Sequence, residues 1–61
     1  MEKSMQHNEG QRVEYRNDEN KKCQGEITKV TGTGPATTYT IKNDKTHRDD
    51  KVREMQIDQS L

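Results

Sequence analysis

The 61-residue sequence contains no tryptophan and no phenylalanine, so its only large aromatic side chains are those of Tyr15 and Tyr39. Only 23% of the residues are hydrophobic, whereas 36% are charged. Such a composition lies near the point at which apolar burial no longer offsets the conformational entropy lost on folding. Any folded core must therefore be small, and a disordered chain is the alternative that composition leaves open.

The chain also lacks a charge excess, a second cysteine and a long apolar segment. Eleven lysines and arginines balance eleven aspartates and glutamates, so composition does not support a nucleic-acid binder that depends on a basic excess. Cys23 alone can form neither an intramolecular disulfide nor a cysteine-rich zinc site. No apolar run approaches the roughly 18 residues that cross a bilayer. We expect an intracellular protein, cytoplasmic or nuclear, with no membrane contact.

Apolar residues alternate with polar ones over short segments, which is the pattern of half-buried β-strands. Val13 and Tyr15 flank Glu14, and Tyr39 and Ile41 alternate with threonines in TTYTI, residues 37–41. β-Branched and aromatic side chains favour extended structure. The TTYTI segment is therefore the clearest predicted strand, with Tyr39 and Ile41 turned inward.

The segment KCQGEITKV, residues 22–30, predicts a longer and bent strand. Cys23 and Ile27 fall on one face, but Val30 breaks the alternation, which indicates a bulge near Thr28. Further along, KVREMQI at residues 51–57 fits a short strand followed by a single helical turn. The intervening loops RNDENKK, TGTGPA and NDKTHRDD are rich in turn-forming residues.

Short strands at about ten-residue spacing predict an all-β barrel or sandwich. We therefore predict one small β-barrel of about five short strands at residues 10–57, with disordered tails at residues 1–9 and 58–61. Tyr15 is expected to be partly exposed. The side chains expected to face inward are those of Val13, Cys23, Ile27, Val30, Tyr39, Ile41, Val52 and Ile57.

The order of these segments resembles SH3-like barrels of the Tudor, Agenet and KOW kind. GQRVEYRNDENKKCQGEITKV is similar to their opening, a Gly-x-x-Val strand, a polar loop and a Gly-x-Ile strand. YTIKNDKTHRDDKVREMQI resembles the second half of a Tudor domain, including its Glu-x-x-Ile ending. The resemblance covers residues 10–57 and implies a small SH3-like barrel.

Tudor domains are best known for reading methylated lysine or arginine, which requires a cage of aromatic rings. Tyr15 fits the first-strand aromatic of such a cage. Further rings of such a cage are often found at two other places, which are occupied here by Lys22 with Cys23 and by Asn43. One exposed ring does not make a cage, so the sequence argues against the reading of methylated residues.

We predict instead a non-catalytic module that binds a protein or peptide segment, as a monomer or weak homo-oligomer. Functional residues concentrate on loops over rigid barrels, so the expected binding face combines the first strand, the loop after it and the NDKTHRDD turn. The alternative is a KOW-like barrel that contacts nucleic-acid phosphates through scattered lysines and arginines. The candidate binding residues are Tyr15, Asn17, Asp18, Lys22, Asn43, Asp44 and His47.

Other chemistries have weaker signatures. The segment DKTHRDD lacks the glycine and the terminal glutamate of a calcium loop. TGTGP lacks the Lys-Ser/Thr pair of a P-loop, and no nucleophile–base pair is visible. We expect no metal, no cofactor and no catalytic activity.

Overall fold

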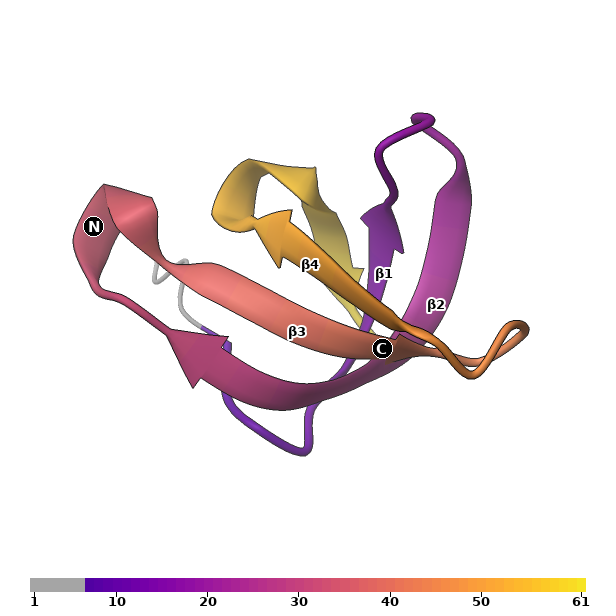
Figure 1. The fold of residues 1–61 in the computed structure, drawn as a ribbon, viewed down its shortest axis with the longest axis horizontal. Helices are drawn as coiled ribbons and strands as arrows, with labels where there is room; N and C mark the ends of the chain where they lie inside the picture. Colours follow the sequence, from indigo (N-terminus) through magenta and orange to yellow (C-terminus); the bar gives the residue numbers. More distant parts are fainter. Residues whose placement is uncertain (1–6) are drawn as a thin grey trace.

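The computed structural model describes residues 7–61, which form one antiparallel sheet of five strands (Figure 1). The all-β prediction of about five short strands is confirmed. A 3-10 turn, η1 (Gly34–Ala36), joins the second strand to the third, and another, η2 (Glu54–Gln56), joins the fourth to the fifth. The strands are β1 (Arg12–Arg16), β2 (Lys22–Thr31), β3 (Thr38–Asn43), β4 (Asp49–Arg53) and β5 (Ile57–Ser60).

The strand order across the sheet is β4-β3-β2-β1-β5, so β4 and β5 are its two edges. The long strand β2 bends, pairing with β1 through residues 22–26 and with β3 through residues 25–31 (Figure 1). The register of β2 and β3 shifts between Ile27 and Lys29. The predicted bulge near Thr28 is thereby confirmed, and it allows both Ile27 and Val30 to reach the core.

The core contains the residues that the alternation predicts, with one correction. Tyr15, expected to be partly exposed, is completely buried. It shares the inner face of β1 with Val13, and the curled sheet covers that face. Cys23, Val30 and Ile57 pack against the core from its margin. The fully or almost fully buried side chains are those of Val13, Tyr15, Ile27, Tyr39, Ile41 and Val52.

The ends of the folded region differ from the predicted boundaries. Residues 58–60, predicted to begin a disordered tail, belong to β5, in which Gln59 and Ser60 pair with β1 and Asp58 lies at a shift in the register. Leu61 then donates its N–H to the Arg12 carbonyl at 2.9 Å. At the other end, residues 1–6 of the predicted tail lie outside the described residues, but the His7 N–H donates to the Tyr39 hydroxyl at 3.2 Å. Within residues 7–61 no helix has the length and apolarity of a membrane span.

Gly25 lies where β2 passes from one partner strand to the other. It is opposite Val13 of β1 and Asn43 of β3. A Cβ atom at this position would overlap the backbone carbonyl oxygen of Lys42 and would come within 2.8 Å of Ile41 Cγ2. Since the obstructing atom belongs to the backbone, β2 and β3 would have to separate to admit a side chain.

We therefore expect Gly25→Ala to lower the free energy of unfolding by about 2–3 kcal/mol, the upper part of the range for overpacked sites. Urea unfolding followed by circular dichroism would measure this loss. The neighbouring Gln24→Ala, at an exposed position of the same strand, should cost less than about 0.5 kcal/mol. Equal losses in the two variants would contradict the steric explanation.

Candidate binding groove

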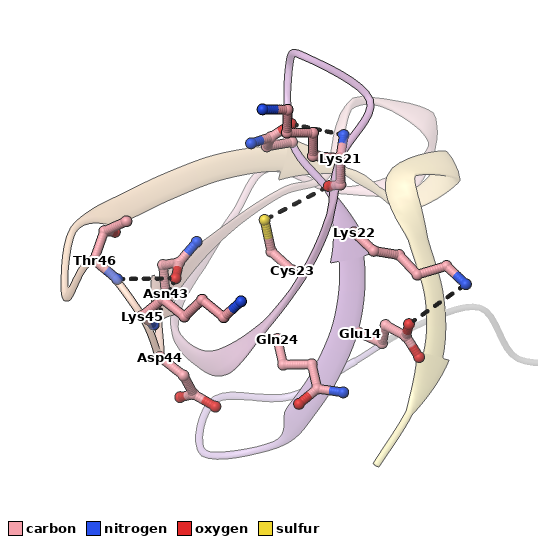
Figure 2. A pocket seen from close by; sticks show the side chains of 10 residues that line it. Glu14, Lys21, Lys22, Cys23, Gln24, Asn43, Asp44, Lys45 and Thr46 are labelled. Carbon is pink, nitrogen blue, oxygen red and sulfur yellow. Dashed lines mark hydrogen bonds and ion pairs between the residues drawn. The ribbon is translucent and has the colours of Figure 1, made fainter.

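A groove lies between the β1–β2 loop and the turn after β3 (Figure 2). It encloses about 340 Å³, within the usual range for ligand sites. One lip is formed by the loop at residues 17–21, and the other by residues 43–46. Residues 22–24 of β2 also line the groove, with Cys23 between the two lips and Lys22 extending toward Glu14, away from residues 43–46 (Figure 2). We call this feature the loop groove.

The side chain of Asn17 organises the first lip. Its Oδ1 accepts the backbone N–H groups of Glu19 at 2.9 Å and Lys21 at 3.0 Å. The Asn17 N–H donates to the Lys21 carbonyl at 3.0 Å, which closes the loop. Asn20 has a φ of 61°, a left-handed conformation that asparagine tolerates better than most residues. The turn-forming residues of RNDENKK thus build a short, internally bonded loop.

Asn43 performs the equivalent function in the second lip, but from a buried position. Its Oδ1 accepts the N–H groups of Lys45 at 2.8 Å and Thr46 at 3.1 Å. The His47 N–H donates to the Asn43 carbonyl at 2.8 Å, and His47 has a φ of 62°. An asparagine that bonds the backbone two and three residues ahead stabilises a tight turn. The predicted hairpin in NDKTHRDD is confirmed.

Both the second lip and the core are attached to Asp50 of β4. The Tyr15 hydroxyl donates to Asp50 Oδ2 at 2.5 Å, and Asn43 Nδ2 donates to the same oxygen at 3.2 Å. Burial is the main cause that raises the pKa of Tyr15 well above its ordinary value, and the hydrogen bond to Asp50 acts in the same direction. Tyr15 therefore acts as a core residue that supports the groove, and its predicted place on an accessible binding face is wrong.

The two carboxylates that line the loop groove have partners within the protein. Arg12 donates from both terminal nitrogens to Asp44, with Nη1 lying 3.3 Å from Oδ1. This hydrogen-bonded pair lowers the pKa of Asp44 and raises that of Arg12. Glu14 Oε1 accepts from Gln59 Nε2 at 2.7 Å, and Glu14 Oε2 lies 3.8 Å from Lys22 Nζ. Both acids are thus at least partly neutralised.

Four of the seven predicted binding residues meet in the loop groove: Asn17, Lys22, Asn43 and Asp44. Asp18 and His47 are exposed but do not line the groove, and Tyr15 is buried.

The prediction missed several lining residues. Lys45 and Thr46 follow Asn43 and Asp44 in the same turn, so their nearness in sequence was the available signal. Gln24 lies two residues after the predicted Lys22 in β2, so both side chains fall on the same face of the strand. This shared face was a second available signal. The remaining lining residues outside the prediction are Glu14, Lys21 and Cys23.

Within residues 7–61 no group of three or more histidine, cysteine, aspartate or glutamate side chains is arranged to hold a metal ion. No family model matches the chain, and neither a curated protein nor a solved structure is significantly similar to it. The residues and geometry of the loop groove therefore provide the basis for a functional proposal.

Replacing Asn43 by alanine removes the acceptor for two backbone N–H groups and the donor to Asp50. Because this site is buried, we expect Asn43→Ala to lower the free energy of unfolding by about 2 kcal/mol. Asn17→Ala also removes an acceptor for two N–H groups, but in an exposed loop where water can replace it, so its cost should be about 1 kcal/mol or less. Urea unfolding of both variants tests the difference, and a larger loss for Asn17→Ala would contradict it.

The raised pKa of Tyr15 predicts a loss of stability in alkali. A hydroxyl whose pKa is higher in the folded state keeps its proton there after the unfolded chain has lost it. Its stabilisation is therefore complete below pH 10, roughly, and declines above it by about 1.4 kcal/mol per pH unit. Tyr39, whose pKa is also raised, adds to the same decline.

Tyr15→Phe should make this alkaline decline shallower, by about 1.4 kcal/mol per pH unit above pH 10.5 or so. Urea unfolding at a series of pH values would measure the slopes. The wild type and the variant should show parallel stabilities between about pH 7 and pH 9, where neither tyrosine titrates. An identical slope for both proteins in strong alkali would show that Tyr15 does not titrate as described.

Proposed function

We propose that the protein is a non-catalytic binding module that holds a segment of a protein partner in the loop groove. It would act inside the cell, as a monomer or weak homo-oligomer. The observation that carries the proposal is the convergence of Asn17, Lys22, Asn43 and Asp44, from two different hairpins, on one concave site. Loops held over a rigid sheet are where binding residues concentrate.

The two lips support this proposal because they are ordered by the protein's own hydrogen bonds. Asn17 and Asn43 each fix a turn through two backbone N–H groups. Asn43 is also bonded to Asp50, which itself accepts from the buried Tyr15. A ligand entering such a site orders few additional groups, so less free energy is lost on binding.

The groove also agrees with the expectation that methylated side chains are not the ligand. Both tyrosines are buried in the core, and no aromatic ring lines the loop groove. The resemblance to SH3-like barrels of the Tudor, Agenet and KOW kind remains a prediction, and we propose a member without an aromatic cage. Its ligand would contact amide groups, ammonium groups and the aliphatic parts of lysine side chains.

Nucleic acid is a second candidate because cations gather elsewhere, on the outer face of the sheet. Thr40 of β3 pairs with Lys29 of β2 on one side and with Lys51 of β4 on the other. Arg53 of β4 lies opposite Thr38 of β3. Within the described chain none of these three cations forms an ion pair. Free cations on an exposed face are what phosphate contacts require.

A peptide-display selection would test the proposed function. Random peptides selected on the wild-type protein should bind a Gln24→Trp variant, whose bulky ring would fill the loop groove, at least about tenfold more weakly, a difference of 1.4 kcal/mol or so. They should bind Lys51→Trp, altered on the outer face, as tightly as the wild type. Equal binding to both variants would remove the groove from the proposal, and failure to select any binder would contradict the binding of a protein segment.

A further inference from the structure

We infer that the loop groove selects an acidic protein segment, because most of its side-chain acceptors are already occupied while the ammonium groups of Lys21 and Lys45 are exposed and available. This inference rests on the proposed function and specifies the class of ligand. Its basis is whether the polar side chains that line the groove already have hydrogen-bond or ion-pair partners, rather than the net charge of the chain.

The acceptors of the loop groove are largely satisfied by the protein itself. Asn17 Oδ1 and Asn43 Oδ1 each accept two backbone N–H groups. Both oxygens of Asp44 accept from Arg12. Glu14 accepts from Gln59 and lies beside Lys22. Thr46 Oγ1 accepts the Arg48 N–H at 3.1 Å. A ligand that donates hydrogen bonds would thus find few open lone pairs.

Among the donors, Asn43 Nδ2 is bonded to Asp50 and Lys22 lies beside Glu14, but those of Lys21, Gln24 and Lys45 are available to a ligand. Within the described chain Lys45 has no carboxylate partner, and Figure 2 shows its side chain extending from the second lip toward the middle of the groove. Lys21 lies 3.9 Å from Glu19, but both side chains are 75% exposed, so this pair contributes little and exchanges readily. The side-chain amide of Gln24, which offers both a donor and an acceptor, has no partner among the described residues.

An anionic ligand matches this arrangement. A carboxylate has two oxygens that only accept, and hydrogen bonds from an ammonium group to a carboxylate are roughly twice as strong as neutral ones. Lys21 and Lys45 stand on opposite lips, so side chains of one acidic segment can reach both. A methylated lysine or arginine would bring a positive charge toward these ammonium groups and would find no ring face.

Matched peptide pools provide the test. Three pools of equal length would carry aspartate and glutamate, serine and glutamine, or lysine and arginine at the same degenerate positions. Each would be titrated into the isotope-labelled protein while amide chemical shifts are recorded. We expect the acidic pool to shift residues 17–24 and 43–46 and to bind at least about tenfold more tightly than the neutral pool. The basic pool should leave these amides unchanged.

Two charge variants identify the groups responsible. Lys45→Gln should weaken binding of the acidic pool several-fold, and Lys29→Gln, the same change on the outer face, should leave it unaffected. Raising the salt concentration from about 50 mM to about 300 mM should weaken the acidic pool, because exposed charges are screened. Equal effects of the two substitutions would overturn the assignment to the loop groove.

The outcomes separate the inference from the proposed function. If the neutral or basic pool binds the groove as tightly as the acidic pool, the inference fails and the proposed function stands. If no pool shifts the groove amides, both fail. A single-stranded oligothymidylate serves as the remaining probe. If it shifts the groove amides more strongly than the acidic pool, a nucleic acid replaces the protein segment as the ligand and the inference is overturned.

Discussion

The burial of two tyrosine side chains is the constraint on which the rest of the fold depends. Tyr15 and Tyr39 are the largest side chains of a core that otherwise contains only valine and isoleucine. A buried hydroxyl without a partner is costly, and here each one donates to a carboxylate. Tyr15 donates to Asp50 in β4, and Tyr39 donates to Glu54 in η2 at 2.8 Å. These two bonds fix β4 and η2 against β1 and β3.

The same constraint determines the geometry of the loop groove. Asp50 Oδ2 accepts from Tyr15 in the core and from Asn43 at the start of the second lip. Asn43 in turn holds the backbone of Lys45 and Thr46. The lip is therefore connected to the core through two side-chain hydrogen bonds, and its shape depends on the same contacts that stabilise the sheet.

The sequence predicts strands and their faces better than it predicts tertiary partners. Side-chain direction alternates along a strand, so the alternation around Tyr39 and its break at Val30 were sufficient for the strand and the bulge. Alternation cannot show how far a sheet curls, and for that reason the burial of Tyr15 was underestimated. The final residues of β5 have exposed polar side chains. Their pairing with β1 depends on the backbone, which leaves no pattern in the sequence.

The candidate site was predictable to a similar extent. Asn17 and Asn43 begin loops rich in turn formers, which made both loops candidates before their positions in space were known. Their convergence depends on the bend of β2 and on Asp50, which is 35 residues from Tyr15. No local pattern reports a partner at that separation. The placement of Cys23 and Gln24 between the lips likewise follows from the packing of the hairpins.

A chain with two aromatic residues cannot use the same rings for its core and for a ligand. Both tyrosines are buried here, so the proposed ligand of the loop groove would be held mainly by amide and ammonium groups. Each hydrogen bond of that kind contributes only about 0.5–1.5 kcal/mol net in water. Several must therefore form together, which requires donors whose positions are fixed before the ligand arrives. Asn43 supplies order of this kind, because it accepts two N–H groups of its turn and donates to Asp50. The stability of the fold and the shape of the proposed binding site therefore depend on the same residues.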